Sequence, residues 1–274
     1  MSDDKPERTP PGFGPPPDLG DMPVDEFRRA AEHVAGMAAD YLEHLEEFAV
    51  LPDLEPGSVR ARLDATPPAQ GEPLERILEE YRGLIEPNIT HWQHPGFMAY
   101  FPSVASGPGI LGEWLSATLN SNVMLWRNAP SSTELEECVV DWMRQMLGLD
   151  DAFDGMFCDT ASMSTLLSIV AARHVVPGLD ARDKGLAGRT DVHPLRMYGS
   201  TETHSSIEKG AIVAGVGREG MRKVPVDDAY RMRPEALSEA IKEDRAAGWT
   251  PFCVVATLGT TSSTSIDPID DIAE

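Results

Sequence analysis

The chain contains 274 residues, 41% of them hydrophobic and 25% charged, and its 45 acidic against 23 basic residues give a formal net charge of −22. This acidity, without any run of lysine and arginine, excludes nucleic acid and anionic membrane surfaces as partners, because both are bound through basic patches. No segment approaches the roughly 18 to 20 apolar residues that cross a bilayer, and the N-terminus lacks the apolar core of a signal peptide, so we expect a cytoplasmic globular protein.

The N-terminal part is predicted to be an arm followed by helices. Residues 1–23 are rich in proline and glycine, a composition that cannot bury a core and predicts a flexible arm. Apolar residues recur at helical spacing over 24–48, which predicts one long amphipathic helix whose apolar stripe packs on another subunit. A second helix is predicted over 72–85 and is ended by Pro87. Residues 24–86 are therefore interpreted as a helical dimerisation segment.

The rest of the chain, 87–274, is predicted to form a large α/β domain. It opens with helices over 109–122 and 132–147, the second capped by Ser132 or Thr133. Short apolar runs then alternate with helical ones, which is typical of a parallel sheet covered on both faces. The predicted strands are 155–158, 195–200, 222–226 and 252–257, and the helices between them are 161–174, 204–215 and 233–248. The last strand is nearly all apolar and is predicted to be central.

Two motif matches do not predict binding sites. Residues 215–220 fit the pattern GxGxxG, but they follow a helix and precede a strand, the reverse of the order that a dinucleotide needs, so we interpret them as a helix C-cap and turn. His91 and His94 have a possible metal spacing without a third ligand nearby, so no metal site is predicted. The three widely spaced cysteines, Cys138, Cys158 and Cys253, are predicted to be buried thiols.

Polar segments follow three of the predicted strands. Residues 159–165 open a helix with small and hydroxyl side chains, which suits phosphate, although a plain N-cap has the same appearance. His204 begins the next such helix, where most histidines are structural. Residues 256–261 follow a buried strand at its carboxyl end, where open α/β sheets bind ligands. The three segments predict one crevice. The aromatic run 91–101 is either a pocket wall or an aromatic mini-core under a loop.

Taken together, these motifs resemble those of the group II pyridoxal-phosphate-dependent amino-acid decarboxylases, closest in style to the aromatic-L-amino-acid decarboxylases. The resemblance extends from about Val24 to the last residue. It rests on the runs HWQHPGFMAYFPSVASGPGILGEWL, WRNAPSSTELE, DWMRQMLGL, TASMSTLLSIVAAR, YGSTETHSSIEKGAIVAGV and FCVVATLGTTSSTSID. It implies the large domain of fold type I, a homodimer embraced by the N-terminal segment, and pyridoxal 5'-phosphate as cofactor.

The resemblance also implies a role for individual residues. Thr160, Ala161 and Ser162 would hold the cofactor phosphate, His204 would stack on the cofactor ring and meet the substrate, and Thr257 would contact the cofactor from its strand end. The positions that match substrate contacts are Trp92, Tyr100, Phe101, Ser103 and, reaching into the neighbouring subunit's site, Met124.

Three parts of the family's machinery have no match in this sequence: the Schiff-base lysine in an HK motif, the aspartate that pairs with the pyridine nitrogen, and a tyrosine on a mobile loop. None of the lysines follows a histidine. We therefore expect a large domain that is incomplete at its C-terminal end, with the remainder lost by truncation or supplied by a second chain. Asp159 replaces a glycine that is common in relatives and is expected to face backbone N–H groups or solvent.

The predicted function is decarboxylation of an L-amino acid to its amine and carbon dioxide. An aromatic amino acid is the preferred substrate. Three alternatives stay open. Arg127 would favour glutamate or another acidic substrate. The chain would otherwise be a non-enzymatic subunit without the lysine, or an aldehyde synthase or transaminase-like enzyme on the same fold.

Overall fold

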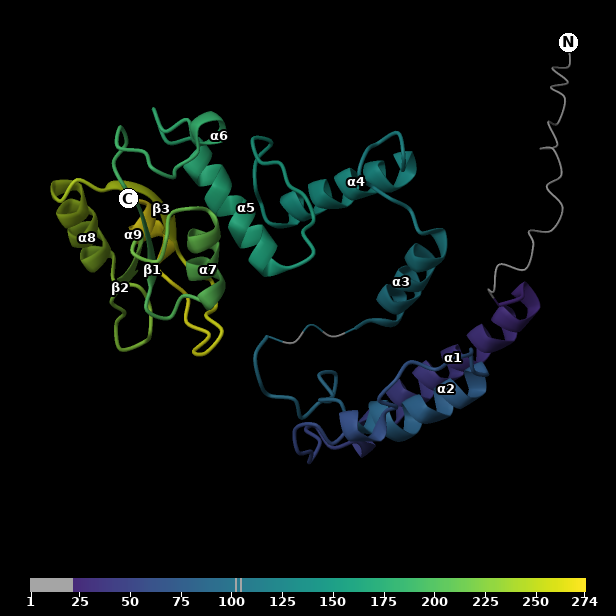
Figure 1. Ribbon diagram of the computed structural model, residues 1–274. Helices are drawn as coiled ribbons and strands as arrows, with labels where there is room; N and C mark the ends of the chain where they lie inside the picture. The colour runs from purple at the N-terminus through teal and green to yellow at the C-terminus, as the bar shows by residue number, and fades with distance from the viewer. Residues whose placement is uncertain (1–21, 102, 104) are drawn as a thin grey trace, which may run out of the picture. The chain divides into compact units, whose positions relative to one another are not determined.

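The computed structural model describes residues 22–101, 103 and 105–274, which form two compact units (Figure 1). The first unit ends at Ala105 and the second begins at Ser106, and each is described by itself. The arm predicted over 1–23 lies outside the described residues, apart from its last two. None of the described helices is long and apolar enough to cross a bilayer.

The N-terminal unit is built on the two predicted helices, α1 and α2. Short 3-10 or π-helical turns accompany them. Its elements are α1 (Val24–Glu43), α2 (Leu74–Glu80), the 3-10 turns Leu45–Glu47, Arg60–Arg62 and Glu86–Asn88, and the π-helical turn Tyr81–Ile85. Pro87 does not end the second helical segment, because it falls in the first turn of a 3-10 helix, where its missing N–H is not needed.

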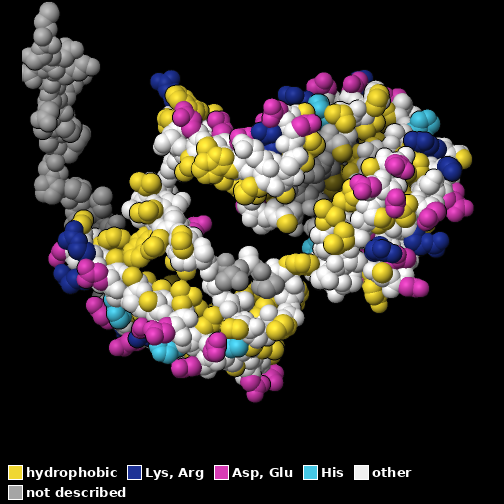
Figure 2. All heavy atoms as spheres, turned by 180° about the vertical axis from the view of Figure 1, so that it is seen from behind, with side chains coloured by type: hydrophobic (Ala, Val, Ile, Leu, Met, Phe, Trp, Pro, Cys, Tyr) yellow, Lys and Arg dark blue, Asp and Glu magenta, His cyan; other side chains and the backbone are white. Residues whose placement is uncertain are grey.

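The apolar stripe of α1 is largely uncovered within its own unit. Only Met37 on this helix is buried, whereas Phe27 is 49% exposed and Val34 and Leu42 are also exposed. Hydrophobic side chains are accordingly visible on the surface of this unit (Figure 2). An uncovered stripe of this kind is what a helix that packs on another subunit presents.

The C-terminal unit contains the predicted helices and a parallel sheet. Its helices are α3 (Gly107–Leu119), α4 (Pro130–Met146), α5 (Ala161–His174), α6 (Ala181–Lys184), α7 (Ser205–Val213), α8 (Pro234–Ala246) and α9 (Ile269–Ala273). Its strands are β1 (Leu195–Ser200), β2 (Met221–Val224) and β3 (Thr250–Val255), in the order β2-β1-β3 and all parallel. The predicted α/β class is confirmed.

The sheet is covered on both faces, also as predicted (Figure 1). Met197 and Tyr198 are consecutive residues of β1, so their side chains point to opposite faces, and both are fully buried. Tyr198 packs in a cluster with Leu237 of α8, and Met197 packs in a second cluster with Ile169 of α5 and Ala211 of α7. The core of this unit therefore lies above and below β1.

Two strand predictions are wrong. The run 252–257 is not central: β3 is at the edge of the described sheet, Val254 is exposed, and β1 is the central strand. The run 155–158 forms no strand among the described residues and lies along α4 instead, where the Phe157 N–H donates to Glu136 Oε1 at 3.2 Å. An apolar run alone does not determine whether a segment pairs as a strand, or with which strand it pairs.

Two local predictions on α4 are also wrong. The helix is capped by Ala129 and not by Ser132 or Thr133, because Pro130 takes the first helical position, for which its ring is pre-organised. The Thr133 hydroxyl instead donates to the Ala129 carbonyl at 2.9 Å. Cys138 is exposed on this helix, although a buried thiol was expected.

The glycines of 215–220 are explained by the turn that was predicted. Gly215 and Gly217 have φ of +77° and +78°, and the Gly217 N–H donates to the Ala211 carbonyl at 3.1 Å, which closes the end of α7. A Cβ on Gly220 would lie 2.6 Å from the Val216 carbonyl oxygen and 2.9 Å from that of Leu195. A glycine is required at position 220 because neighbouring backbone atoms leave no room for a side chain, and nucleotide binding is not needed to explain it.

We therefore expect Gly220→Ala to lower the free energy of unfolding by about 1–3 kcal/mol, because the added methyl group meets backbone atoms that cannot turn away. Gly112→Ala is the matched control, since nothing lies within 4 Å of its Cβ on α3. This control should leave stability unchanged or raise it by up to about 1 kcal/mol. Denaturant unfolding of both variants tests the prediction, and equal midpoints would contradict it.

Candidate functional site

The N-terminus of α5 carries unpaired backbone donors. Thr160 is the N-cap, with extended φ and ψ of −145° and 155°, and its Oγ1 accepts from the Met163 N–H at 3.2 Å. The N–H groups of Ala161 and Ser162 have no partner among the described residues. Two free donors at the positive end of a helix suit an anion. Asp159 caps nothing and is exposed, in agreement with the solvent-facing alternative.

His204 is the N-cap of α7. Its Nδ1 accepts from the Ser206 N–H at 3.2 Å and lies 2.9 Å from Ser206 Oγ. Because a backbone N–H can only donate, the neutral ring carries its proton on Nε2. The structural role expected for most such histidines is therefore present, and the exposed ring retains an N–H donor that a ligand can use.

Thr257 is fixed by a buried carboxylate that sequence reasoning missed. The Thr257 N–H donates to Asp267 Oδ2 at 2.7 Å, and the Asp267 N–H donates back to the Thr257 carbonyl at 3.0 Å. Asp267 Oδ1 accepts from the Met232 N–H at 2.7 Å, and the side chain is only 2% exposed. Asp267 thus ties the end of β3 to the loop before α8.

The hydroxyl side chains that follow β3, over residues 260–265, stabilise a loop and do not form a binding surface. Thr260 is buried, and its Oγ1 lies 2.6 Å from Ser263 Oγ and 3.2 Å from Ser265 Oγ. The Ser265 hydroxyl donates to the Tyr230 carbonyl at 2.8 Å. These hydroxyls bond to one another and to backbone, so of the predicted third segment only its beginning, at Thr257, is a candidate for ligand contact.

One cavity of about 320 Å³ lies close in sequence to the three segments of the predicted crevice. Its walls come from α5, from α7 and from the end of β3. The lining residues are Ser164, Thr165, Ser168, Ile169, Ile207, Cys253, Val254, Val255 and Ala256. None of the predicted cofactor residues lines the cavity itself, but Ser162, His204 and Thr257 each stand within three residues of its wall in the sequence.

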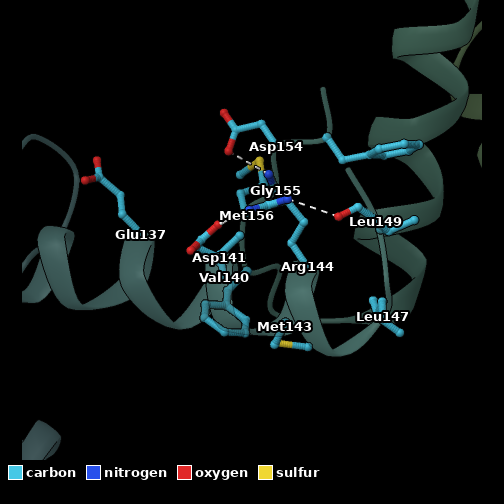
Figure 3. Close-up of a pocket in the computed structure, with 12 residues that line it drawn as sticks. Glu137, Val140, Asp141, Met143, Arg144, Leu147, Leu149, Asp154, Gly155 and Met156 are labelled. Atoms are coloured by element: carbon cyan, nitrogen blue, oxygen red, sulfur yellow. Dashed lines mark hydrogen bonds and ion pairs between the residues drawn. The ribbon is translucent and has the colours of Figure 1, made fainter. Parts of the chain in front are cut away.

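A second cavity, of about 290 Å³, lies between α4 and the segment 149–157 (Figure 3). Its walls are mostly apolar, and the one cation in them, Arg144, is already paired. Arg144 donates to Asp141 Oδ1 at 2.8 and 2.9 Å and to the Leu149 carbonyl at 3.0 Å, and it forms an ion pair with Asp151 at 2.8 Å. None of the predicted site residues lines this cavity, so it is not the candidate site.

The aromatic run forms an exposed stack in the N-terminal unit, and not a buried mini-core. The Trp92 ring lies 4.8 Å from the Phe97 ring and 5.5 Å from the Tyr100 ring, measured between centroids. Trp92 is 47% and Tyr100 70% exposed, and Phe101 and Ser103 are exposed beside them. Tyr100 has φ of +56°, a left-handed conformation that a non-glycine residue adopts only when its surroundings hold it there.

Met124 and Arg127 belong to the C-terminal unit. Met124 is exposed, and its N–H donates to Asn122 Oδ1 at 2.9 Å. Arg127 is exposed and forms no ion pair with any described residue. The predicted substrate residues are thus divided between the two units, and the structure groups only those of the aromatic stack.

Comparison with known proteins identifies the family of this chain. Residues 56–274 match the family described as the pyridoxal-dependent decarboxylase conserved domain. The chain belongs to this family. The resemblance found in the sequence motifs is therefore confirmed.

Individual relatives agree with this assignment. This chain is 38% identical to the aromatic-L-amino-acid decarboxylase of Bos taurus over 260 residues, which cover 92% of this chain and 53% of that protein. It is 37% identical to the phenylacetaldehyde synthase of Petunia hybrida, over 91% of this chain and 50% of that protein. The chain spans about half the length of the curated relatives it matches.

A solved structure supports the fold. The Catharanthus roseus tryptophan decarboxylase in complex with L-tryptophan superposes with a TM-score of 0.85 and 35% identity, over 92% of this chain and 53% of that chain. The predicted fold type I architecture, represented here in part, is confirmed.

Within this decarboxylase-family chain, Asp267→Ala should lower the free energy of unfolding by about 2–4 kcal/mol, because each buried N–H left without an acceptor costs on the order of 1–3 kcal/mol. Asp267→Asn keeps one acceptor oxygen and should lose less. Asp271→Ala, at an exposed position of α9, is the control and should change stability by less than about 0.5 kcal/mol. Urea unfolding compares the three, and a similar loss in all of them would refute the role of Asp267.

Proposed function

We propose that this chain forms the phosphate-binding part, and part of the substrate pocket, of a pyridoxal-5'-phosphate-dependent decarboxylase that converts an aromatic L-amino acid to its amine and carbon dioxide. The observation that carries the proposal is the pair of unpaired N–H groups of Ala161 and Ser162, beside a cavity shared by α5, α7 and β3. These donors suit an anion, and a pyridoxal-dependent family supplies one in the phosphate of its cofactor.

The residues at this site fit the proposed cofactor. The N–H groups of Ala161 and Ser162 and the hydroxyls of Thr160 and Ser162 would hold the phosphate, and the small side chain of Ala161 leaves room for it. When bound, pyridoxal 5'-phosphate supplies an electron sink for the charge left on Cα as the carboxylate departs. His204 would stack on the cofactor ring and offer its Nε2–H, while its Nδ1 stays fixed by Ser206. Thr257, held by Asp267, would contact the cofactor from the end of β3.

The preference for an aromatic substrate is supported by the aromatic stack. Exposed rings of Trp92 and Tyr100, only 10° from parallel, offer faces on which another ring can pack. Phe101 and Ser103 would complete this wall, and Met124 would reach the site of the neighbouring subunit in a homodimer. The uncovered stripe of α1 supports such a dimer.

We place the lysine, aspartate and tyrosine of the family's machinery outside these 274 residues, because no lysine here stands in an HK context and the chain spans about half of its relatives. The active enzyme would then need a further polypeptide segment, on the same or a second chain. A cytoplasmic location remains a prediction.

An acidic substrate is the second candidate, and Arg127 is the observation that favours it. Its exposed guanidinium is unpaired among the described residues and lies close in sequence to Met124, so it would meet a substrate carboxylate if Met124 lines the pocket.

Carbon dioxide release from a panel of amino acids tests the proposed function. The assembly that contains this chain and the lysine-bearing segment, loaded with pyridoxal 5'-phosphate, should release carbon dioxide from aromatic L-amino acids. Release from glutamate but not from aromatic substrates would favour the acidic alternative, and its loss in Arg127→Ala would assign that substrate to Arg127.

The same preparation locates the lysine. After treatment with borohydride and denaturation, the cofactor should stay attached to the lysine-bearing segment and not to these 274 residues. Cofactor attached to a peptide of this chain would contradict our placement of the lysine.

His204→Asn should lower turnover about 100-fold or more while leaving stability close to that of the wild type. Asparagine is a good N-cap and can still accept from the Ser206 N–H, so this variant separates the ring from the cap. His204→Ala removes both, and its unfolding free energy should fall by about 1 kcal/mol. His174→Ala, at the exposed end of α5, is the control. Unchanged turnover in His204→Asn would leave this histidine with a structural role alone.

A further inference from the structure

His91 is the most deeply buried polar side chain near the aromatic stack. It is 1% exposed, and its Nδ1 lies 2.9 Å from the Tyr41 hydroxyl of α1. The imidazole packs against the Phe48 ring at a centroid distance of 4.5 Å, and the His91 N–H donates to the Val50 carbonyl at 3.0 Å. Side chain and backbone of this one residue therefore attach the aromatic run to α1 and to the segment that follows it.

Burial of an imidazole needs an explanation, because an apolar side chain would fill the same space without a desolvation penalty. His91 Nε2 is buried and has no hydrogen-bond partner among the described residues. Burial lowers the pKa of His91, which keeps the ring neutral near pH 7. The hydrogen bond between Nδ1 and the Tyr41 hydroxyl offsets part of this desolvation penalty. We therefore take this hydrogen bond as the reason that a histidine occupies the position.

The backbone that carries the stack starts from His91 through consecutive turns. The His94 N–H donates to the His91 carbonyl at 3.0 Å, and the Phe97 N–H donates to the His94 carbonyl at 2.9 Å. Trp92 follows His91 directly in the sequence. The Tyr100 ring stacks on Trp92, and the Tyr100 backbone has a left-handed conformation. A strained residue keeps such a conformation only in a loop that is held firmly, and the buried point of attachment of this loop is His91.

We propose that His91, held by Tyr41, is a positioning residue that sets the aromatic wall of the substrate pocket. The proposal rests on the proposed function, in which Trp92 and Tyr100 meet the substrate. His91 itself does not touch substrate or cofactor and acts through the loop that it anchors. Loosening the anchor should weaken substrate binding more than it slows the chemical step, because the aromatic wall binds the substrate side chain and carries out no proton transfer.

The test compares variants in the cofactor-loaded, lysine-containing assembly. Tyr41→Phe removes the hydroxyl, and His91→Phe keeps an aromatic ring without nitrogen. His91→Asn restores a polar atom close to the position of Nδ1 and should rescue the wild-type behaviour only when Tyr41 is present. Tyr81→Phe removes another hydroxyl from the same unit and is the matched control.

Two measurements are made on each variant: KM and kcat with the preferred amino acid, and exchange of the hydrogen-bonded amides of His94 and Phe97. Tyr41→Phe and His91→Phe should raise KM about tenfold with kcat changed by less than about threefold, as expected for lost substrate binding. Exchange of the two amides should accelerate about tenfold, because the opening of the loop becomes easier.

The outcomes separate this inference from the proposed function. Unchanged amide exchange in Tyr41→Phe would overturn the anchoring role, and a lowered kcat at constant KM would overturn the link to the substrate wall. Rescue by His91→Asn in the Tyr41→Phe background would show that packing and not the hydrogen bond matters, which also overturns it. If the wild type releases no carbon dioxide, the proposed function and the link to the substrate wall both fail, and amide exchange alone decides whether His91 anchors the loop. If His91→Phe does not fold, Tyr41→Phe carries the test.

Discussion

Parallel pairing of β1 with both β2 and β3 is the constraint on which the candidate site depends. Parallel strands end at the same edge of their sheet, so the segments that leave β1 and β3 must begin side by side. His204 and Thr257 stand in these two segments, and α5 packs against both α7 and β3. The N-terminus of α5 is thereby brought close to the sheet edge, although no hydrogen bond in the described part of the chain joins it to His204 or Thr257.

Polar groups of the C-terminal unit are paired in one region and left unpaired in another. On α8, the buried Asp244 lies 3.3 Å from Arg196 and 3.0 Å from Arg222, and Arg196 also stacks on the Trp249 ring. Burial, with Asp244 beside it, raises the pKa of Tyr198 in the same region. Arg222 also lies 2.5 Å from Glu243, so two arginines face two carboxylates. At the start of α5, by contrast, N–H donors are left without partners, and it is there that a charged ligand has something to gain by binding.

The sequence was a good guide where the determinants are local. The bounds of α5 and β1 agree with the prediction residue for residue, because helical periodicity and apolar runs are written in neighbouring positions. Pairing is not local, which is why β3 was misplaced at the centre and 155–158 was taken for a strand. The contact of Asp267 with Met232 spans 35 residues and that of His91 with Tyr41 spans 50, and no pattern along the chain announces either.

The division of the chain into two units separates the two tasks of the proposed site. The N–H groups that are proposed to bind the phosphate belong, with His204, to the C-terminal unit, whereas the described contacts of the aromatic stack lie in the N-terminal unit, through His91, Tyr41 and Phe48. Each unit has its own buried polar attachment, Asp267 in one and His91 in the other. In the proposed function, substrate preference therefore changes through the aromatic run without disturbing the residues proposed to hold the cofactor, because the two sets share no hydrogen bond among the described residues.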